Sequence, residues 1–436
     1  MVVAHDENLM SEDPPTGAPS PRRLLKVLGP GLITGASDDD PSGIATYSQV
    51  GAQFGFGLAW TLLFSYPLMA GIQEISARIG RVTGRGLAGN LRRHSPHWLS
   101  RLLVVLLFVA NVANLGADLG AMGAALKLLI SGPALLYVFL FGVGSVLLEV
   151  FTQYAHYVSI LKWLCFSLLS YVICAFVVDV SWADLARSLV WPPLSIHQDY
   201  LMAIVAVLGT TISPYLFFWQ AQQEVEDFRM DKISRPLIRA AAQASPAFAR
   251  IRLDTYIGMG ISNAIALFIV VTTAATLHAH GTTLIQTSAE AAEALRAVAG
   301  PLTFVVFAAG IIGTGLLTLP VLAGSAAYAV GELMAWRVGL RRQPARAKAF
   351  YATIAIATLI GAGLNATSID PIKALYWSAV LNGVIAVPVM FVMMRLAMRP
   401  AVMGDFVLPK GLRVLGWVAT AAMSCAVVAM IVTSFV

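Results

Sequence analysis

The sequence has little charge for its length. Only 12% of its 436 residues are Asp, Glu, Lys or Arg, whereas 58% are hydrophobic and the mean hydropathy is +0.76. Soluble domains carry about 25% charged residues, so this composition excludes an ordinary soluble protein and indicates a chain that lies in a lipid bilayer. The formal net charge of +6 does not indicate a nucleic-acid partner, because the basic residues of a membrane protein first report its orientation.

Cysteine and the familiar catalytic motifs are also scarce. The three cysteines, Cys165, Cys174 and Cys425, lie in apolar runs without CxxC or Cys/His spacing, so neither a disulfide framework nor a structural zinc site is indicated. The chain lacks a Gly-x-Ser-x-Gly elbow, a His-Glu-x-x-His pair and a GxxxxGK[ST] loop. We therefore expect neither an enzyme nor an ATP-driven pump, and no tightly bound cofactor.

Long apolar segments dominate the sequence. A helix needs about 20 mainly apolar residues to cross the hydrocarbon core of a membrane, and eleven segments meet this requirement. They lie near residues 25–54, 57–80, 101–127, 133–152, 155–178, 200–225, 253–276, 301–335, 347–365, 372–397 and 413–435. The pattern predicts an all-α membrane protein with about eleven transmembrane helices.

Arginine and lysine are concentrated in alternate loops between these segments. The loops after the second, sixth and eighth segments are rich in them, whereas Arg187 alone follows the fifth segment and Arg296 alone follows the seventh. Because basic loops stay on the cytoplasmic side, this alternation predicts a cytoplasmic N-terminus and an external C-terminus in the plasma or inner membrane. Residues 1–23 lack the order of a signal peptide and are expected to form a disordered cytoplasmic tail.

Two of the eleven segments are interrupted near their middle. The stretch GASDDDPSGIATYSQ, residues 35–49, places three aspartates directly before Pro41, and the sixth segment carries Ser213-Pro214. Proline removes a backbone donor, and such breaks are tolerated at membrane depth only where they line protein or a cavity. Breaks five segments apart are typical of a transporter with inverted repeats. We expect repeats at about 25–178 and 200–397 and an extra helix at 413–435, within a transporter domain of residues 24–435.

The aspartates distinguish a binding site from two simple proline kinks. A charged side chain at the bilayer centre costs at least ~2.5 kcal/mol and usually marks an ion or substrate path. Asp40 directly precedes the break and is expected to face a cavity, where freed carbonyls add oxygen ligands. Asp38 and Asp39 are offset around the helix and are expected to line an acidic vestibule. A carboxylate among carbonyls and hydroxyls predicts a cation site.

Several motifs resemble those of the Nramp family of divalent metal transporters. LGPGLITGASDDDPSGIATYSQVGAQFGFGLAW is similar to that family's first helix, and ISARIGRVTGRGLAG to the stretch after its second helix. GADLG and SPYLF are similar to motifs of its third and sixth helices. The resemblance extends from about residue 24 to 435. It implies a LeuT-like fold, with five-plus-five inverted repeats and broken helices 1 and 6, in a secondary transporter that moves a divalent metal cation by alternating access.

The metal site that the resemblance implies is altered in this chain. The family's Asp-Pro-Gly-Asn is replaced by Asp40-Pro41-Ser42-Gly43, and its Met-Pro-His by Ser213-Pro214-Tyr215. The aspartate is kept, while the asparagine, the thioether and the imidazole are lost. Oxygen ligands suit hard ions such as Mg²⁺ or Mn²⁺. With Thr210 where the family donates a backbone carbonyl, the expected metal set is Asp40, Ser42, Gly43, Thr210, Ser213 and Tyr215.

The resemblance also implies a proton pathway, which is reduced here. Asp118 matches the family's proton-carrying aspartate, and Lys348 stands for part of a basic pair. Ala121 replaces the acid that the family has three residues after this aspartate. The sequence therefore leaves proton coupling open.

Two other functions are compatible with parts of this sequence. The same fold could carry another small solute, such as an amino acid or an organic cation, with no transition-metal site, since Tyr215 and the aromatic residues after it could line a larger pocket. Adjacent aspartates could also serve an intramembrane hydrolase, but a second Gly-x-Gly-Asp segment is missing. We expect a monomer that contacts the lipid bilayer, a divalent metal ion as substrate and, if transport is coupled, protons.

Overall fold

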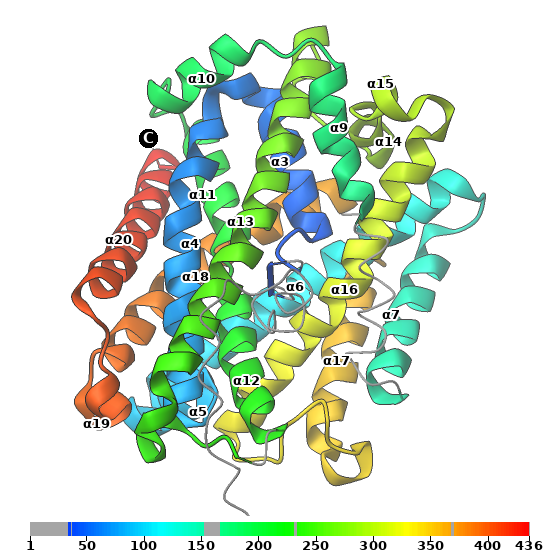
Figure 1. Cartoon of the computed structure of the whole chain (residues 1–436). Coiled ribbons are helices and arrows are strands. Elements are labelled where there is room, and N and C mark those ends of the chain that lie inside the picture. The colour runs from blue at the N-terminus through cyan, green and yellow to red at the C-terminus, as the bar shows by residue number, and fades with distance from the viewer. Residues whose placement is uncertain (1–33, 36, 152–165, 231–232, 368–369, 436) are drawn as a thin grey trace, which may run out of the picture.

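The computed structural model describes residues 34–35, 37–151, 166–230, 233–367 and 370–435, and these residues form helices without any β-strand (Figure 1). The long helices of the first half are α3 (Pro41–Phe54), α4 (Ala59–Thr83), α6 (His97–Leu129), α7 (Ala134–Phe151), α9 (Leu169–Val177) and α11 (Gln198–Thr211). Those of the second half are α12 (Pro214–Met230), α13 (Ala244–Thr276), α16 (Thr303–Leu333), α17 (Lys348–Leu364), α18 (Pro371–Ala397) and α20 (Lys410–Thr433). Short helices connect them: α5 (Leu87–His94), α10 (Trp182–Val190), α14 (Ser288–Glu293), α15 (Arg296–Ala299) and α19 (Pro400–Met403).

The prediction of an all-α membrane fold is confirmed. Eight helical stretches of the described chain are long and apolar enough to cross a membrane, or nine with the bent pair α9 and α10. By this measure α3 and α4 form one stretch, and α17 falls short with 17 residues. Helix is therefore present in all eleven predicted segments, although the first, the fourth and the fifth lie partly outside the described residues, and the tail of residues 1–23 lies wholly outside them.

Both predicted helix breaks are present. In the first, Thr34 and Gly35 are helical, residues 37–40 are not, and α3 begins at Pro41. In the second, α11 ends at Thr211 and α12 begins at Pro214. Proline suits the first position of each new helix, because an amide N–H there would lack an intrahelical acceptor.

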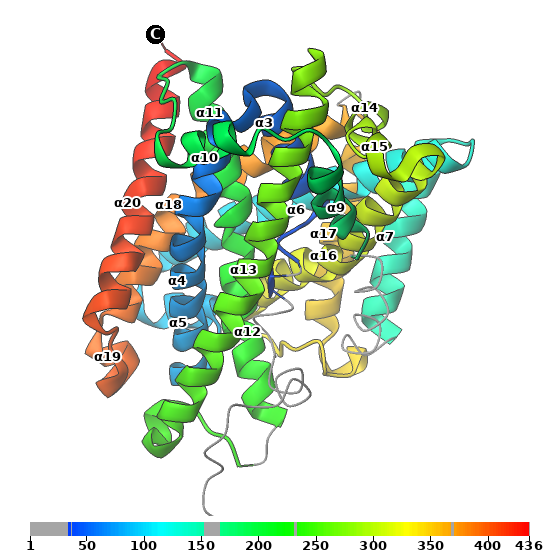
Figure 2. The ribbon, with the colours of Figure 1, turned by 45° about the horizontal axis from the view of Figure 1, so that its top comes forward.

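The broken helices pack closely against the rest of the bundle. A Cβ on Gly209 of α11 would lie 2.0 Å from the carbonyl oxygen of Ala379 in α18. α20 follows the edge of the bundle beside α18 and α11 (Figures 1 and 2). The second broken helix is thus held between the core and the C-terminal helix.

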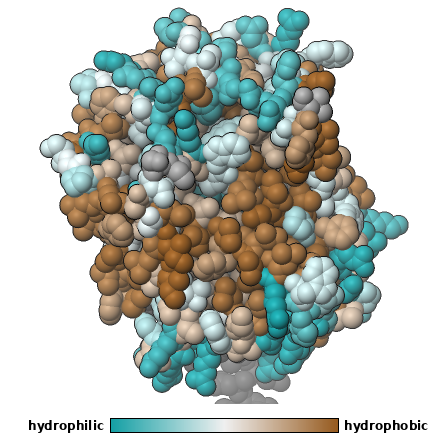
Figure 3. All heavy atoms as spheres, turned by 180° about the vertical axis from the view of Figure 1, so that it is seen from behind, coloured by the Kyte–Doolittle hydropathy of each residue, from teal (hydrophilic) through white to brown (hydrophobic). Residues whose placement is uncertain are grey.

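Three arginine-rich loops meet at one end of the bundle, which we call the arginine-rich face (loops after α4, α12 and α16). Arg81 near the end of α4 donates to the carbonyl of Arg235 after α12 at 2.9 Å. The carboxylate of Glu332 at the end of α16 accepts from the backbone N–H groups of Gly86 and Gly89, both at 2.8 Å. Between this face and the opposite end, the surface is a belt of apolar side chains (Figure 3), as expected for contact with lipid.

The close contact at Gly209 predicts a packing defect on substitution. Gly209→Ala places a methyl group against the Ala379 carbonyl, and overpacking of this kind destabilises by about 1–3 kcal/mol. We expect a lower thermal unfolding midpoint in detergent. Gly144→Ala in α7 is the matched control, because no atom outside the local helix lies within 4 Å of its Cβ position. An equal midpoint for both variants would contradict this packing.

Candidate cation site

Asp40 lies at the N-terminal end of α3, directly at the first break. Its Oδ1 accepts a hydrogen bond from the backbone N–H of Gly43 at 2.6 Å, so the side chain caps the helix. Its Oδ2 accepts from the hydroxyl of Tyr215 on α12 at 3.3 Å. Only 2% of Asp40 is exposed. The helix N-terminus carries partial positive charge, which lowers the cost of burying a carboxylate here.

Tyr215 joins the two broken helices. Besides Asp40, its hydroxyl lies 3.4 Å from the carbonyl oxygen of Ser37. The same carbonyl accepts from the hydroxyl of Thr318 on α16 at 3.3 Å. The Asp40 carboxylate, the Ser37 carbonyl and the Tyr215 phenol therefore face one another between α3, α12 and α16.

Ser42 and Gly43 have different positions relative to Asp40. The hydroxyl of Ser42 donates to the carbonyl of Leu375 on α18 at 2.9 Å and lies 3.1 Å from the hydroxyl of Ser378. Its side chain is thus engaged with α18. A Cβ on Gly43 would lie 3.3 Å from the carbonyl oxygen of Asp38 and from Oδ1 of Asp40. A side chain at position 43 would therefore extend from among the oxygen atoms around Asp40.

Thr210 and Ser213 lie at the second break. The hydroxyl of Ser213 is 2.7 Å from the carbonyl oxygens of both Gly209 and Thr210, which the end of α11 leaves without helical partners. The hydroxyl of Thr210 is 3.0 Å from that of Tyr47 on α3. The Thr210 carbonyl, which the family resemblance assigns to the metal set, accepts a hydrogen bond from Ser213 in this conformation.

Tyr47 connects these two groups of residues, and sequence reasoning missed it. A Cβ on Gly43 would lie 3.3 Å from Cε2 of its ring, and the Tyr47 hydroxyl meets Thr210 as described. Asp40, Gly43 and Tyr47 are spaced by three and four residues, so they share one face of α3. That helical spacing was the available signal.

Asp38 and Asp39 face α13. Ser262 lies 2.7 Å from Oδ2 of Asp38 and 3.1 Å from Oδ1 of Asp39. The two aspartates are only 1% and 3% exposed, so the predicted acidic vestibule is closed in this conformation. No sequence motif pointed to Ser262, because it lies more than 200 residues from its partners.

The structure brings Asp118 to the site and leaves Lys348 outside it. Asp118 is fully buried in α6, and its carboxyl group interacts electrostatically with Asp40 and with the backbone N–H of Ser42. Gly116 of the same helix lies level with Gly361 near the end of α17. Lys348 is exposed at the start of α17, about 20 Å away along that helix.

The donor set is made of oxygen. Asp40, the Ser37 carbonyl, Tyr215 and the end of α11 supply carboxylate, carbonyl and hydroxyl groups, without sulfur or imidazole. Among the described residues, no three or more His, Cys, Asp or Glu side chains converge closely enough to hold a metal ion. A cation here would combine one carboxylate with neutral oxygens and retained water, which is the environment that hard divalent ions accept.

Solved structures share this fold. A manganese transporter of Eremococcus coleocola superposes with a TM-score of 0.69 at 18% identity, over 96% of this chain and 90% of that one. A nucleobase-cation-symport-1 family transporter superposes with a TM-score of 0.57 at 15% identity, over 94% of this chain and 92% of that one. The LeuT-like fold that the family resemblance implied is confirmed.

Sequence comparison identifies the family. The divalent metal cation transporter MntH of Yersinia enterocolitica is 26% identical over 310 residues, which cover 68% of this chain and 70% of that protein. The family described as natural resistance-associated macrophage protein-like, or Nramp, matches residues 31–433. Because this match covers nearly the whole transmembrane region, the chain belongs to the Nramp family.

Proposed function

We propose that the chain is a secondary transporter that carries a hard divalent cation, of the Mg²⁺ or Mn²⁺ class, by alternating access. The observation that carries this proposal is the buried Asp40 carboxylate at a broken helix, facing Tyr215 and the carbonyl of Ser37. The metal transport named for the MntH relative supports a divalent cation as substrate. The oxygen donors of this chain favour the harder members of that class.

Ser213 is central to this choice of ion. Its hydroxyl satisfies two carbonyls at the end of α11 and offers oxygen where the family resemblance places a sulfur ligand. A cation that binds here can recruit the same carbonyls by displacing the hydroxyl's hydrogen bonds. Mg²⁺ keeps part of its water shell in most protein sites, which suits a set with few charged ligands.

We infer that Asp118 is the proton carrier, if transport is coupled to protons. The carboxyl groups of Asp118 and Asp40 interact in a buried environment. Two negative charges so placed are costly unless a cation lies near them. Arrival of a cation at Asp40 therefore favours proton release from Asp118. Lys348 is too distant to take part directly in this conformation.

We propose a cytoplasmic arginine-rich face and an external C-terminus in the cell membrane, because basic loops stay inside. The two breaks at corresponding positions support inverted repeats at about 25–178 and 200–397, with α20 appended. A single chain contains the whole candidate site, so we propose that a monomer suffices for transport.

Neutralising Asp40 should abolish transport without unfolding the protein. Asp40→Asn keeps an N-cap side chain but removes the carboxylate that we propose as the charged ligand of the cation. We expect uptake of Mn²⁺ into proteoliposomes to fall to background, with an unchanged thermal unfolding midpoint. Glu149→Gln is the control, because Glu149 is another buried acid, on α7, bonded to Ser145. Full uptake by Asp40→Asn would refute the proposal.

Restoring the soft ligand should change selectivity. Ser213→Met supplies a thioether beside the second break, and we expect calorimetry to show Cd²⁺ affinity raised by about tenfold relative to Mg²⁺. Adding Gly43→Asn should raise it further, after the neighbours at 3.3 Å shift by a few tenths of an ångström. Ser378→Met on α18 controls for added sulfur near Ser42. No gain over this control would show that positions 43 and 213 do not reach the cation.

The proposed orientation can be tested with single cysteines in a background without Cys165, Cys174 and Cys425. Ala345 lies exposed on the arginine-rich face and Ser434 lies exposed at the end of α20. An impermeant thiol reagent applied to intact cells should label Ser434→Cys and leave Ala345→Cys unlabelled until the cells are opened. The opposite pattern would reverse the orientation, and equal labelling of both would contradict the eleven-segment topology.

A further inference from the structure

A cavity of about 680 Å³ lies at the arginine-rich face, apart from the candidate cation site. Its lining comes from the end of α4, the end of α12, the loop after α12 and the start of α13. Asp227 and Arg250 lie on one side of it, and Arg81, Gln243 and Ser234 are also among its lining residues. The cavity therefore has a mixed polar and apolar lining, and it lies near the C-terminal end of α12, whereas Tyr215 lies near the start of that helix.

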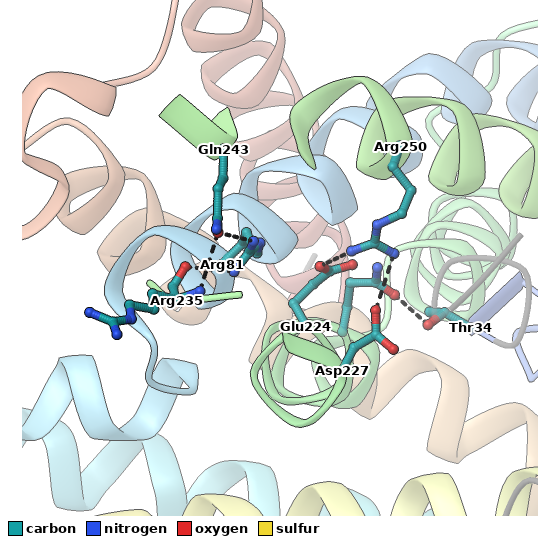
Figure 4. Close-up of polar contacts among 8 residues, drawn as sticks. Thr34, Arg81, Glu224, Asp227, Arg235, Gln243 and Arg250 are labelled. Carbon is teal, nitrogen blue, oxygen red and sulfur yellow. Dashed lines mark hydrogen bonds and ion pairs between the residues drawn. The ribbon is translucent and has the colours of Figure 1, made fainter. Parts of the chain in front are cut away.

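One wall of this cavity is tied down by a cluster of hydrogen bonds. Arg81 donates to the carbonyl of Arg235 at 2.9 Å and to Oε1 of Gln243 at 3.4 Å (Figure 4). Gln243 also accepts from the backbone N–H of Arg235 at 3.2 Å and donates to the carbonyl of Ile233 at 3.1 Å. These bonds fix the loop after α12 to the end of α4.

The opposite wall is held by an ion pair between two helices. Arg250 of α13 donates to Oε2 of Glu224 on α12, and its Nη1 lies 3.7 Å from Oδ2 of Asp227 (Figure 4). Glu224 is fully buried, whereas Arg250 is 24% exposed. Oε1 of Glu224 has no hydrogen-bond partner among the residues that the structure describes. Asp254, one turn after Arg250, interacts electrostatically with Glu224 and with Arg250. The single positive charge of Arg250 therefore interacts with three carboxylates.

The ion pair is continuous with the candidate cation site. Gln220, Glu224 and Asp227 are spaced by four and three residues and therefore share a face of α12. At the Gln220 end, this face of α12 contacts the first broken helix before its break, where the hydroxyl of Thr34 donates to Oε1 of Gln220. Thr34 precedes Ser37, whose carbonyl faces Tyr215 at the site. A line of oxygen-bearing side chains thus leads from Asp40 to the cavity.

A guanidinium on a buried carboxylate has the charge of a bound cation. Removing it leaves Glu224 buried and unpaired, which is strongly unfavourable, so Arg250 holds α12 and α13 together while no other cation is present. A divalent ion that reaches Glu224 can replace this charge and free the two helices to separate. Among the described residues, no three acidic, histidine or cysteine side chains converge closely enough to hold a metal ion. A divalent cation at Glu224 would therefore be bound weakly enough to move on.

We propose that the Glu224–Arg250 ion pair is the gate of the cation route on the arginine-rich face, and that Glu224 and Asp227 bind the passing divalent cation when Arg250 is displaced. This inference rests on the proposed function for the cation itself. The gate, however, can be tested without measuring transport.

The test uses Ser37→Cys as a reporter, in the full-length chain without its three native cysteines. Ser37 is fully buried at the candidate cation site, where its carbonyl faces Tyr215. Arg250→Gln should raise the rate of its modification by an impermeant thiol reagent on the order of tenfold or more in inside-out vesicles, with no rise in intact cells. Arg296→Gln is the matched control, because Arg296 forms an exposed ion pair with Glu293 outside this region.

Two further variants decide between a gate and simple loss of packing. Exchanging the charges, with Glu224→Arg and Arg250→Glu together, should return the modification rate toward that of the parent. Glu224→Gln should open the gate as Arg250→Gln does, but should slow Mn²⁺ uptake more, because it also removes a carboxylate from the route. An unchanged rate in Arg250→Gln, or a failure of the exchanged pair to restore it, would overturn the gate.

The two proposals fail in different ways. If Ser37→Cys responds as expected while Asp40→Asn keeps full uptake, the proposed gate is supported and the proposed cation site is refuted. If uptake depends on Asp40 while the modification rate of Ser37→Cys does not respond to Arg250→Gln, the proposed cation site is supported and the proposed gate is refuted. If Glu224→Gln and Arg250→Gln slow uptake equally, Glu224 is not a ligand to the passing ion.

Discussion

The structure is organised around one constraint, the burial of the Asp40 carboxylate in the middle of a helical bundle. A charge in this environment needs compensation from nearby groups. The chain provides it by breaking the first helix, so that the free N–H groups and the partial positive charge of a helix N-terminus meet the carboxylate. The bond from Gly43 at 2.6 Å and the Tyr215 hydroxyl supply the rest.

The break creates a second requirement, because it also frees backbone carbonyls. At the first break the Ser37 carbonyl faces Tyr215 and Thr318, and at the second break the carbonyls of Gly209 and Thr210 face Ser213. These oxygens are satisfied by hydroxyl groups whose hydrogen bonds can be exchanged for a cation. The same carbonyl and hydroxyl oxygens that stabilise the two breaks are thus available as ligands.

Much of this arrangement could be predicted from the sequence, for reasons that are local. The lengths of the apolar segments predicted the helices, and Pro41 and Pro214 predicted the two breaks. The energetic cost of burying a charge indicated that Asp40 has a function. These signals depend on residues within one or two turns of each other. Tyr47 was also within reach, because it lies on the face of α3 that carries Asp40 and Gly43.

The remaining contacts could not be predicted because they join distant segments. Ser262 and Thr318 bond to residues of the first break from α13 and α16, and no local pattern marks either of them. For Lys348, in contrast, the sequence suggested a contact that the structure does not contain. Alignment with the family suggested a role beside Asp118, but Asp118 lies level with the other end of α17, so the position along the helix separates the two residues.

Selectivity and helix geometry are therefore coupled at Ser213. The hydroxyl group at this position has to satisfy the carbonyls of Gly209 and Thr210, a task that a thioether cannot perform because it has no hydrogen to donate. In a chain with methionine here, those carbonyls would depend on water or on the bound metal. An oxygen ligand that also donates a hydrogen bond lets the site stay closed without a cation, at the expense of affinity for soft metals. The proposed preference for hard ions and the integrity of the broken helix thus depend on the same side chain.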